Sequence, residues 1–252
     1  MPENTNGSGQ LADEAYLLIR ERILSGKYTF GMVISRRDLA KELGVSLVPI
    51  NEAICRLENE YLIVNTPRVG TKVRVPTPQE IRGFWAVREG LETQAARLFA
   101  AGASDKERAE LVELAQQLDL MHESSTDSEI PDPERLYPWR CAHMRFHMRI
   151  AECTRLPFLT RQVERNQILI FNWFYDHQLY GKRKEPSDWH EQLAHSLANE
   201  PPAEADAAMR KHLHNKVEDL MRSLERVLLM DETHLAHWNQ PSSLVTAASA
   251  KK

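Results

Sequence analysis

Four histidines in the second half of the chain have the residue type and spacing of a transition-metal site. His143 and His147 are four residues apart, so on a helix both imidazoles lie on one face and can reach one metal ion. His190 and His212 follow, on segments expected to be successive antiparallel helices. The chain has ten histidines, so spacing alone leaves open that these are ordinary core or partly exposed histidines.

Such a cluster also suggests an alternative, a metal-dependent hydrolase whose ion activates water. No nucleophile motif or placed general base accompanies the four histidines in the sequence. Four protein ligands also leave little room for a substrate on the metal unless its coordination number expands. We therefore expect a binding site, and predict that the protein is not an enzyme.

The segments that must position the histidines are long and amphipathic, which indicates an antiparallel bundle of six or seven helices. Thr77 and Glu80 have the spacing of a capping box at the start of the first helix. Nothing after this point has the pattern of a strand. The expected helices are residues 80–101, 105–123, 133–154, 158–178, 187–198 and 203–230.

A helix-turn-helix is predicted between Ser35 and Leu62. Gly44 ends the first short helix, and Ser46 is placed to cap the second. The second helix has apolar residues at helical spacing on one face, which leaves the other face exposed. An ordinary pair of helices is the alternative from this stretch alone. The apolar residues are Ile50, Ala53, Ile54 and Leu57.

The flanking segments complete a winged helix. A helical pattern from Leu11 to Ile23 precedes the helix-turn-helix, and residues 28–34 allow one edge strand. Residues 63–75 predict a two-stranded hairpin with Gly70 at its bend. Three basic residues in or beside this wing are placed to meet phosphates, and a solvated charged hairpin is the alternative. They are Arg68, Lys72 and Arg74.

The resulting prediction is a mostly α-helical protein with two domains. A disordered tail (1–9) precedes the winged helix (10–76), and the helical domain (77–232) is followed by a flexible tail (233–252). Residues 10–76 hold ten Lys/Arg and eight Asp/Glu, a net of +2 in a chain of net charge −4, as in a small nucleic-acid module on an acidic body. No apolar run is long enough to span a bilayer, so we expect a cytoplasmic protein without a membrane partner.

These pieces resemble the GntR family of bacterial transcription regulators, in its FadR-like branch with the helical effector domain called FCD. The matching motifs are I-x-x-G (Ile23–Gly26), LA-x-x-LGVS (Leu39–Ser46), P-I-x-E-A-I-x-R-L (Pro49–Leu57) and G-T-K-V (Gly70–Val73). VREGLETQAARLFA (Val87–Ala100) is similar to the first helix of the FCD domain. The resemblance covers nearly the whole length.

The recognition helix departs from the family pattern S-R-T-P-V-R. Leu47 and Asn51 stand where the family has arginines, and Val48 replaces a polar residue. Each missing arginine removes a guanine or phosphate contact, whereas Asn51 has the groups to pair bidentately with adenine. The DNA-binding residues implied by the resemblance are Arg37, Ser46, Leu47, Val48, Asn51, Arg68, Gly70 and Lys72.

The resemblance also implies a metal site, because FCD domains commonly have D-x-x-F-H on one helix and a widely spaced pair of histidines on later ones. Phe146-His147, His190 and His212 match this pattern, and His143 stands in place of the aspartate. Four imidazoles favour zinc or nickel over magnesium. Because neutral imidazoles do not compensate the positive charge of the metal, an anionic effector can bind as a further ligand. Arg88 matches the family's carboxylate anchor; pairing with Glu92 is the alternative.

The resemblance therefore implies a DNA-binding regulator, expected to be a repressor. We expect it to act as a homodimer on a palindromic operator. A small organic acid bound beside the metal would modulate that binding. The altered recognition helix leaves open another alternative, a ligand sensor that has lost specific DNA recognition.

Overall fold

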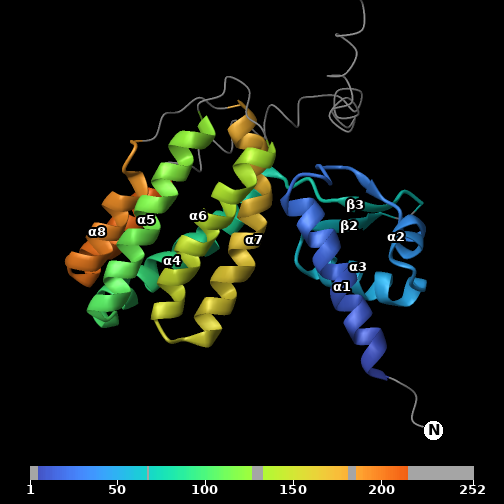
Figure 1. Cartoon of the computed structure of the whole chain (residues 1–252), viewed down its shortest axis with the longest axis horizontal. Coiled ribbons are helices and arrows are strands. Elements are labelled where there is room, and N and C mark those ends of the chain that lie inside the picture. The colour runs from blue at the N-terminus through green and yellow to red at the C-terminus, as the bar shows by residue number, and fades with distance from the viewer. Residues whose placement is uncertain (1–4, 67, 127–132, 181–185, 215–252) are drawn as a thin grey trace, which may run out of the picture. The chain divides into compact units, whose positions relative to one another are not determined.

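The computed structural model describes residues 5–66, 68–126, 133–180 and 186–214. The chain divides into two compact units, and the division falls between Val75 and Pro76. Figure 1 shows the elements of both units. Each unit has its own hydrophobic core, so each is described by itself.

The first unit is a winged helix. Its elements are α1 (Thr5–Leu24), β1 (Val33–Ile34), α2 (Arg36–Leu43), α3 (Leu47–Asn59), β2 (Ile63–Thr66) and β3 (Gly70–Val73). The strands form an antiparallel sheet in the order β1-β3-β2, with Ile63 opposite Val73 and Val33 opposite Lys72. The three-stranded sheet includes the edge strand and the hairpin predicted from the sequence.

Local chemistry explains the boundaries of the helix-turn-helix. The Ser35 hydroxyl accepts a hydrogen bond from the Asp38 amide and caps α2. Gly44 ends α2 with a φ of +64°, a left-handed conformation that favours glycine. Ser46 occupies the N-cap position of α3, but its side chain makes no capping hydrogen bond. The capping role expected for the Ser46 hydroxyl is therefore wrong.

Helix α1 is longer than the sequence predicts. It begins at Thr5, so residues 5–9, expected to belong to a disordered tail, are helical. Once a helix has nucleated, each further residue adds a hydrogen bond, and the buried Ala15 and Ile19 anchor the helix that these turns extend. The tail expected at 233–252 lies outside the described residues.

The second unit is helical throughout its described part. It contains α4 (Pro78–Gly102), α5 (Asp105–Thr126), α6 (Pro133–Cys153), α7 (Pro157–Tyr180) and α8 (Trp189–Asn199), and residues 202–214 are also helical. Thr77 and Glu80 form the predicted capping box at α4. The predicted fold class, a winged helix followed by a helical bundle, is confirmed.

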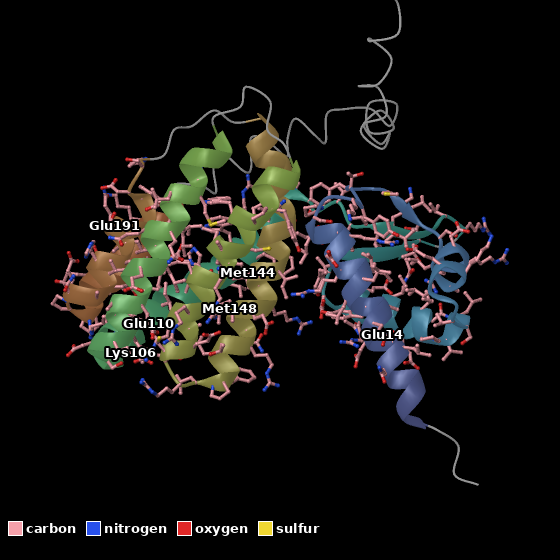
Figure 2. The ribbon with its side chains drawn as sticks, viewed as in Figure 1. Glu14, Lys106, Glu110, Met144, Met148 and Glu191 are labelled. Carbon is pink, nitrogen blue, oxygen red and sulfur yellow. The ribbon has the colours of Figure 1, made fainter. Side chains whose placement is uncertain are left out.

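Helix α5 packs against α6 and α8, and α4 packs against α6, α7 and α8. The core contains Phe99, Leu111, Phe146 and Leu197. Gln116 of α5 donates a hydrogen bond of 2.7 Å to Glu191 of α8, which is labelled in Figure 2. No described helix is long and apolar enough to cross a membrane.

Candidate functional site

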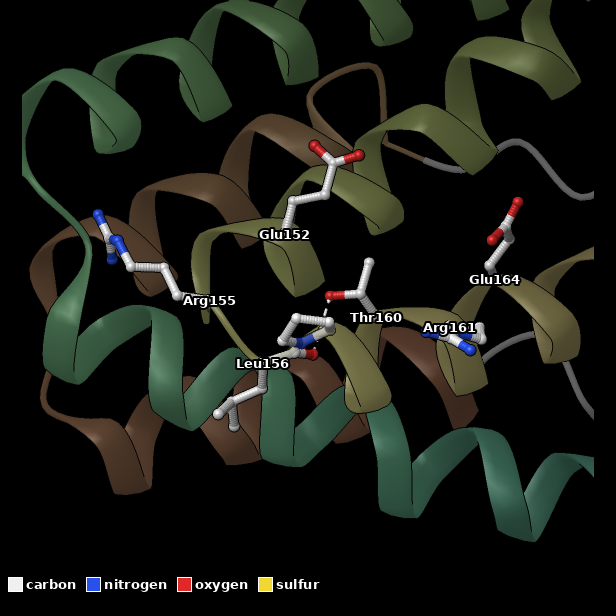
Figure 3. A pocket seen from close by; sticks show the side chains of 7 residues that line it. Glu152, Arg155, Leu156, Thr160, Arg161 and Glu164 are labelled. Carbon is white, nitrogen blue, oxygen red and sulfur yellow. Dashed lines mark hydrogen bonds between the residues drawn. The ribbon is translucent and has the colours of Figure 1, made fainter.

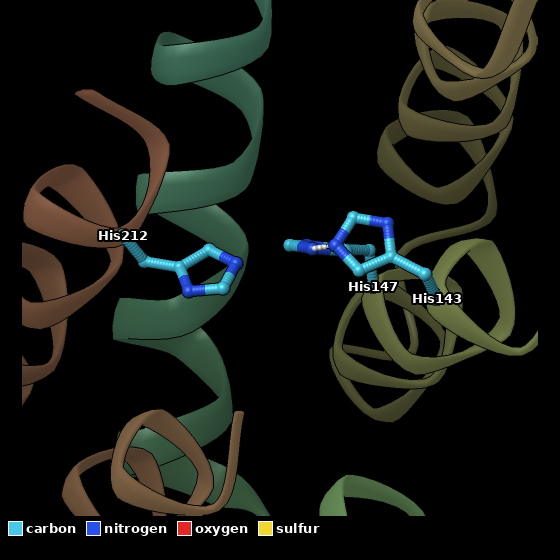
Figure 4. Close-up of side chains that lie close together, drawn as sticks. All are labelled: His143, His147 and His212. Carbon is cyan, nitrogen blue, oxygen red and sulfur yellow. Dashed lines mark hydrogen bonds between the residues drawn. The ribbon is translucent and has the colours of Figure 1, made fainter. Parts of the chain in front are cut away.

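Three of the four predicted histidines converge inside the bundle. His143 and His147 lie on α6, His212 lies on the helix of residues 202–214, and one ring nitrogen of each is within 4.8 Å of the others. Figure 4 shows His212 pointing toward the α6 pair from the opposite side. The Nε2 atoms of His143 and His147 are 3.2 Å apart. Residues far apart in the sequence are thus brought to one point.

His190 lies next to this trio, on the first turn of α8. Its ring centroid is 5.1 Å from that of His143 and 5.2 Å from that of His212. Its Nδ1 atom is 2.5 Å from Oδ1 of Asp119 on α5, and Asp119 also accepts hydrogen bonds from the amides of His190 and Glu191. Asp119 therefore fixes the direction of the His190 ring, with Nδ1 as the nitrogen that faces the carboxylate.

A second buried carboxylate orients His147. Oε2 of Glu92, on α4, is 2.5 Å from His147 Nδ1, while its Oε1 accepts hydrogen bonds from Arg88 Nε and Gln167 Nε2 at 2.7 and 2.6 Å. Burial alone would raise the pKa of Glu92, but the charges of Arg88 and His147 outweigh it and hold the pKa at about 2. Glu92 is therefore an ionised hydrogen-bond acceptor.

The residues present fit a transition-metal ion. Two imidazole nitrogens on a tetrahedral zinc ion, with Zn–N distances of about 2.0–2.1 Å, lie roughly 3.3 Å apart, close to the 3.2 Å found here. Metal-bound histidines commonly donate their other ring nitrogen to a carboxylate, as His147 and His190 are placed to do. An all-imidazole donor set suits zinc or nickel rather than magnesium.

Arg88 forms an ion pair with Glu92, which was the alternative to its predicted role as the anchor for a carboxylate effector. It is 2% exposed, donates to Glu92 and lies 5.0 Å from the Trp85 ring centroid. A guanidinium has four N–H donors besides the one used here. Effector binding by Arg88 therefore remains a prediction.

Besides Gln167, two buried polar residues on the helices that form the site were not predicted as part of it. Asp119 follows Leu111 and Ala115 at helical spacing, so it lies on the apolar stripe of α5, where an acid is unusual. Arg140, 3% exposed, precedes His143 by three residues and therefore shares its face of α6. In both cases helical periodicity in the sequence could have indicated that the polar side chain lies on the buried face of its helix.

The pocket in Figure 3 shares no lining residue with the histidine cluster. It has a volume of about 360 Å³ and lies at the turn between α6 and α7. Arg155 there has a φ of +59° and donates to Glu107 of α5. Glycine and asparagine are the residue types that adopt this left-handed conformation most readily. Arg155 adopts it with the support of the Glu107 ion pair.

The predicted DNA-binding residues lie on the surface of the winged helix. Leu47 and Val48, at the start of α3, are 45% and 58% exposed. Asn51, one turn further along, is exposed too. The others are exposed except Lys72, which is half-buried; they are Arg37, Ser46, Arg68, Gly70 and Lys72.

Arg36 connects the recognition helix to the wing. Its guanidinium donates to Asn51 Oδ1 on α3 at 2.8 Å, to Thr71 Oγ1 on β3 at 2.9 Å and to Asn65 Oδ1 on β2 at 2.5 Å. Asn65 in turn donates to Glu58 of α3. The sequence analysis did not predict this role, because the three partners of Arg36 lie 15 to 35 residues away.

Family models match both units. Residues 11–73 match the bacterial regulatory proteins of the gntR family, and residues 84–215 match the FCD domain. The FCD match alone covers more than half of the chain. Members of this family are transcription regulators, which confirms the prediction that the protein is not an enzyme.

Individual relatives agree with the family models. An uncharacterized HTH-type regulator of Agrobacterium vitis, from the TAR-I ttuE-ttuC' intergenic region, is 29% identical over 154 residues, 60% of this chain and 84% of that protein. The HTH-type regulator McbR of Escherichia coli is 23% identical over 163 residues, 63% of this chain and 70% of that protein.

Solved structures show the same fold. The E. coli McbR/YncC structure has a TM-score of 0.67 at 18% identity, covering 84% of this chain and 97% of that one. A GntR regulator from Rhodococcus sp. RHA1 has a TM-score of 0.65 at 18% identity, covering 85% and 97%. The chain belongs to the GntR family of DNA-binding transcription regulators, with an FCD domain following its winged helix.

Proposed function

We propose that this regulator is a repressor whose operator binding responds to a small carboxylate bound at a metal in the FCD domain. The observation that supports this most directly is the convergence of His143, His147 and His212 within 4.8 Å. His190, oriented by Asp119, is the proposed fourth ligand. The metal is proposed to be zinc or nickel.

In this proposal each part of the cluster has a separate task. Glu92 and Asp119 orient the imidazoles of His147 and His190. The metal, when bound, supplies a Lewis-acid site for a carboxylate oxygen. Arg88 and Arg140 are the proposed cationic partners of the effector, because both are buried and Arg140 shares a helix face with His143.

Metal analysis of the purified full-length protein tests the centre. We expect close to one zinc or nickel ion per chain, and its loss in the His147→Ala variant. His195, which is exposed on α8, provides the matched control, since His195→Ala should keep the metal. Equal metal content in the two variants would contradict the proposal.

The operator is proposed to be palindromic and bound by a homodimer, because two winged helices related by a twofold axis meet two half-sites. Small carboxylates are titrated into the complex of the full-length protein with promoter DNA. A carboxylate that shifts the melting temperature of the metal-loaded protein should also weaken DNA binding. If every carboxylate that binds leaves DNA affinity unchanged, this coupling is wrong.

A second function is favoured by Leu47 and Asn51, which replace DNA-contacting arginines in the recognition helix. In that case the protein is a ligand sensor without specific DNA recognition. A selection from random double-stranded DNA decides between the two functions. An enriched, symmetric sequence supports the repressor, and the absence of any enriched sequence supports the sensor.

A further inference from the structure

We infer that the recognition helix of this regulator is built to contact thymine in the major groove, rather than the guanine that arginines would contact. The inference rests on the proposed insertion of α3 into DNA and names the bases that it selects. Three side chains at the start of α3 are responsible, and Arg36 of α2 sets the orientation of one of them. The three side chains are Leu47, Val48 and Asn51.

The first step is the orientation of the Asn51 amide. A guanidinium has only donors, so the atom of Asn51 that faces Arg36 must be the carbonyl oxygen Oδ1. The amide nitrogen Nδ2 is bonded to the same carbon and is turned away from the guanidinium. Asn51 is exposed, so its donor is the group presented for base contact.

Arg36 is held in place by the wing, so this orientation is fixed rather than incidental. Thr71, which is 2% exposed, and Asn65 accept two further hydrogen bonds from the same guanidinium. Thr71 also donates to Asn65 at 2.7 Å. Exchanging the positions of the two Asn51 amide atoms would place its NH₂ group against a cation with no acceptor, at the cost of one hydrogen bond.

The second step is the apolar surface beside this donor. Leu47 and Asn51 are separated by one helical turn, and Val48 and Asn51 by three residues, so both apolar side chains adjoin the amide on the helix surface. Leu47 is 45% exposed and Val48 58% exposed. The first turn of a recognition helix is the part that contacts base edges.

Thymine is the base whose major-groove edge matches this combination. It offers one acceptor, O4, next to an apolar C5-methyl group. Guanine offers two acceptors that normally pair with a bidentate arginine, and it has no methyl group. Adenine needs both a donor and an acceptor from Asn51, and Arg36 already occupies one lone pair of Oδ1, so its guanidinium competes with the adenine N6 amino group for that oxygen. The bidentate adenine contact predicted from the sequence is therefore replaced by a contact to thymine.

The experiment begins with a selection from random double-stranded DNA, using the full-length protein at fixed salt. We expect a half-site with one or two specified thymines. Each thymine is then replaced by deoxyuridine, which lacks only the methyl group, and affinity is measured by fluorescence anisotropy. Removing one buried methyl should weaken binding about fourfold. Unchanged affinity for every uridine duplex, or a half-site specified by guanine, would overturn the inference.

Variants identify the residues responsible. At least one of the two variants Leu47→Ala and Val48→Ala should no longer distinguish thymine from uridine. Val33→Ala is the matched control, because Val33 is 53% exposed on β1, outside the recognition helix, and should behave as the parent protein does. Asn51→Asp keeps the acceptor for Arg36 but has no donor, so affinity should fall about tenfold.

Arg36→Met tests the orientation itself. With the guanidinium removed, the Asn51 amide can rotate, and a second selection should return adenine at the same position. Circular dichroism of the variant establishes that it is folded. If the folded variant still selects thymine, Arg36 does not set the specificity. If the parent protein enriches no sequence at all, the proposed operator binding fails as a whole, a different result from a guanine half-site.

Discussion

Two histidines in the bundle interior contact a carboxylate through Nδ1, and this common arrangement determines what their rings can do. His147 contacts Glu92 and His190 contacts Asp119, in both cases with a separation of 2.5 Å. A carboxylate at Nδ1 fixes the tautomer, aims Nε2 and makes it a stronger metal ligand. Both carboxylates are themselves buried, so they are not shared with solvent.

We predict that Asp119→Asn lowers metal affinity about 10- to 100-fold, the usual effect of removing a partner that orients a ligand. The amide is a weaker acceptor for His190 Nδ1 than the carboxylate it replaces. Competition with a chromophoric chelator measures the change. Asp206→Asn, which alters a surface ion pair with Arg210, should leave affinity unchanged. Equal affinities of the Asp119 variant and the parent protein would contradict the orienting role of Asp119.

His143→Asp tests the residue at which this chain departs from the FCD pattern. A carboxylate in this position should retain metal binding and widen the range of metals, because hard oxygen ligands suit manganese and magnesium. Metal analysis after growth or dialysis with mixed metals measures the preference. A variant that binds no metal would show that the site needs the imidazole.

At the scale of elements, side chains at helix ends set where helices start and stop. Ser104 precedes α5, and its amide and hydroxyl donate to Glu107, whose own amide donates to the Ser104 hydroxyl. The hydrogen bonds from the Ser104 amide and hydroxyl, followed by Arg155, lower the pKa of Glu107 to about 2. The folded state therefore favours the ionised form of Glu107.

A pH dependence follows from this lowered pKa. The stabilisation by Glu107 should be complete above pH 4.5, the ordinary pKa, and should be lost as the pH falls from there toward 2. Glu107→Gln keeps the capping-box hydrogen bonds but removes the charge, so it should destabilise the protein by roughly 0.3–1 kcal/mol at neutral pH. Denaturant unfolding at pH 7 and pH 3 measures both values. A difference between variant and parent that does not shrink at pH 3 would contradict this.

Gly44 and Gly90 make a matched pair for backbone conformation. Neither has any atom within 4 Å of an added Cβ, but only Gly44 has a positive φ, +64°. Gly44→Ala should cost about 1 kcal/mol of stability. Gly90→Ala, on the exposed face of α4, should stabilise by roughly 0.5–1 kcal/mol. Thermal unfolding measures both, and equal melting temperatures would show that the turn relaxes.

At the scale of the whole molecule, the chain consists of two compact units with separate cores. The histidine cluster belongs to the second unit alone, because α4, α5, α6, α8 and the helix of residues 202–214 supply its residues. The Arg36 network belongs to the first unit alone. Metal binding should therefore stabilise the two units unequally.

We predict that chelation lowers the melting transition of the FCD domain and leaves that of the winged helix nearly unchanged. At a metal concentration 100 times the dissociation constant, the lost stabilisation is about 2.7 kcal/mol. Differential scanning calorimetry of the full-length protein, with and without chelator, separates the two transitions. The His147→Ala variant should show no response to chelator. An equal shift of both transitions would indicate that the units unfold together.

The sequence by itself determined the elements. Apolar periodicity, Gly44 and the Thr77–Glu80 capping box depend on residues within a few positions of one another, so they predicted the helices, the turn and the wing. The same periodicity put His143 and His147 on one face of α6.

Only the tertiary structure decided which distant side chains meet. His212 lies beside His147, Asp119 orients His190 and Arg36 turns the Asn51 amide, although none of these pairs is close in the sequence. No local pattern encodes these contacts, because they depend on how whole helices pack. The orientation of the His190 ring in the histidine cluster and of the Asn51 amide on the recognition helix is therefore set by the tertiary structure.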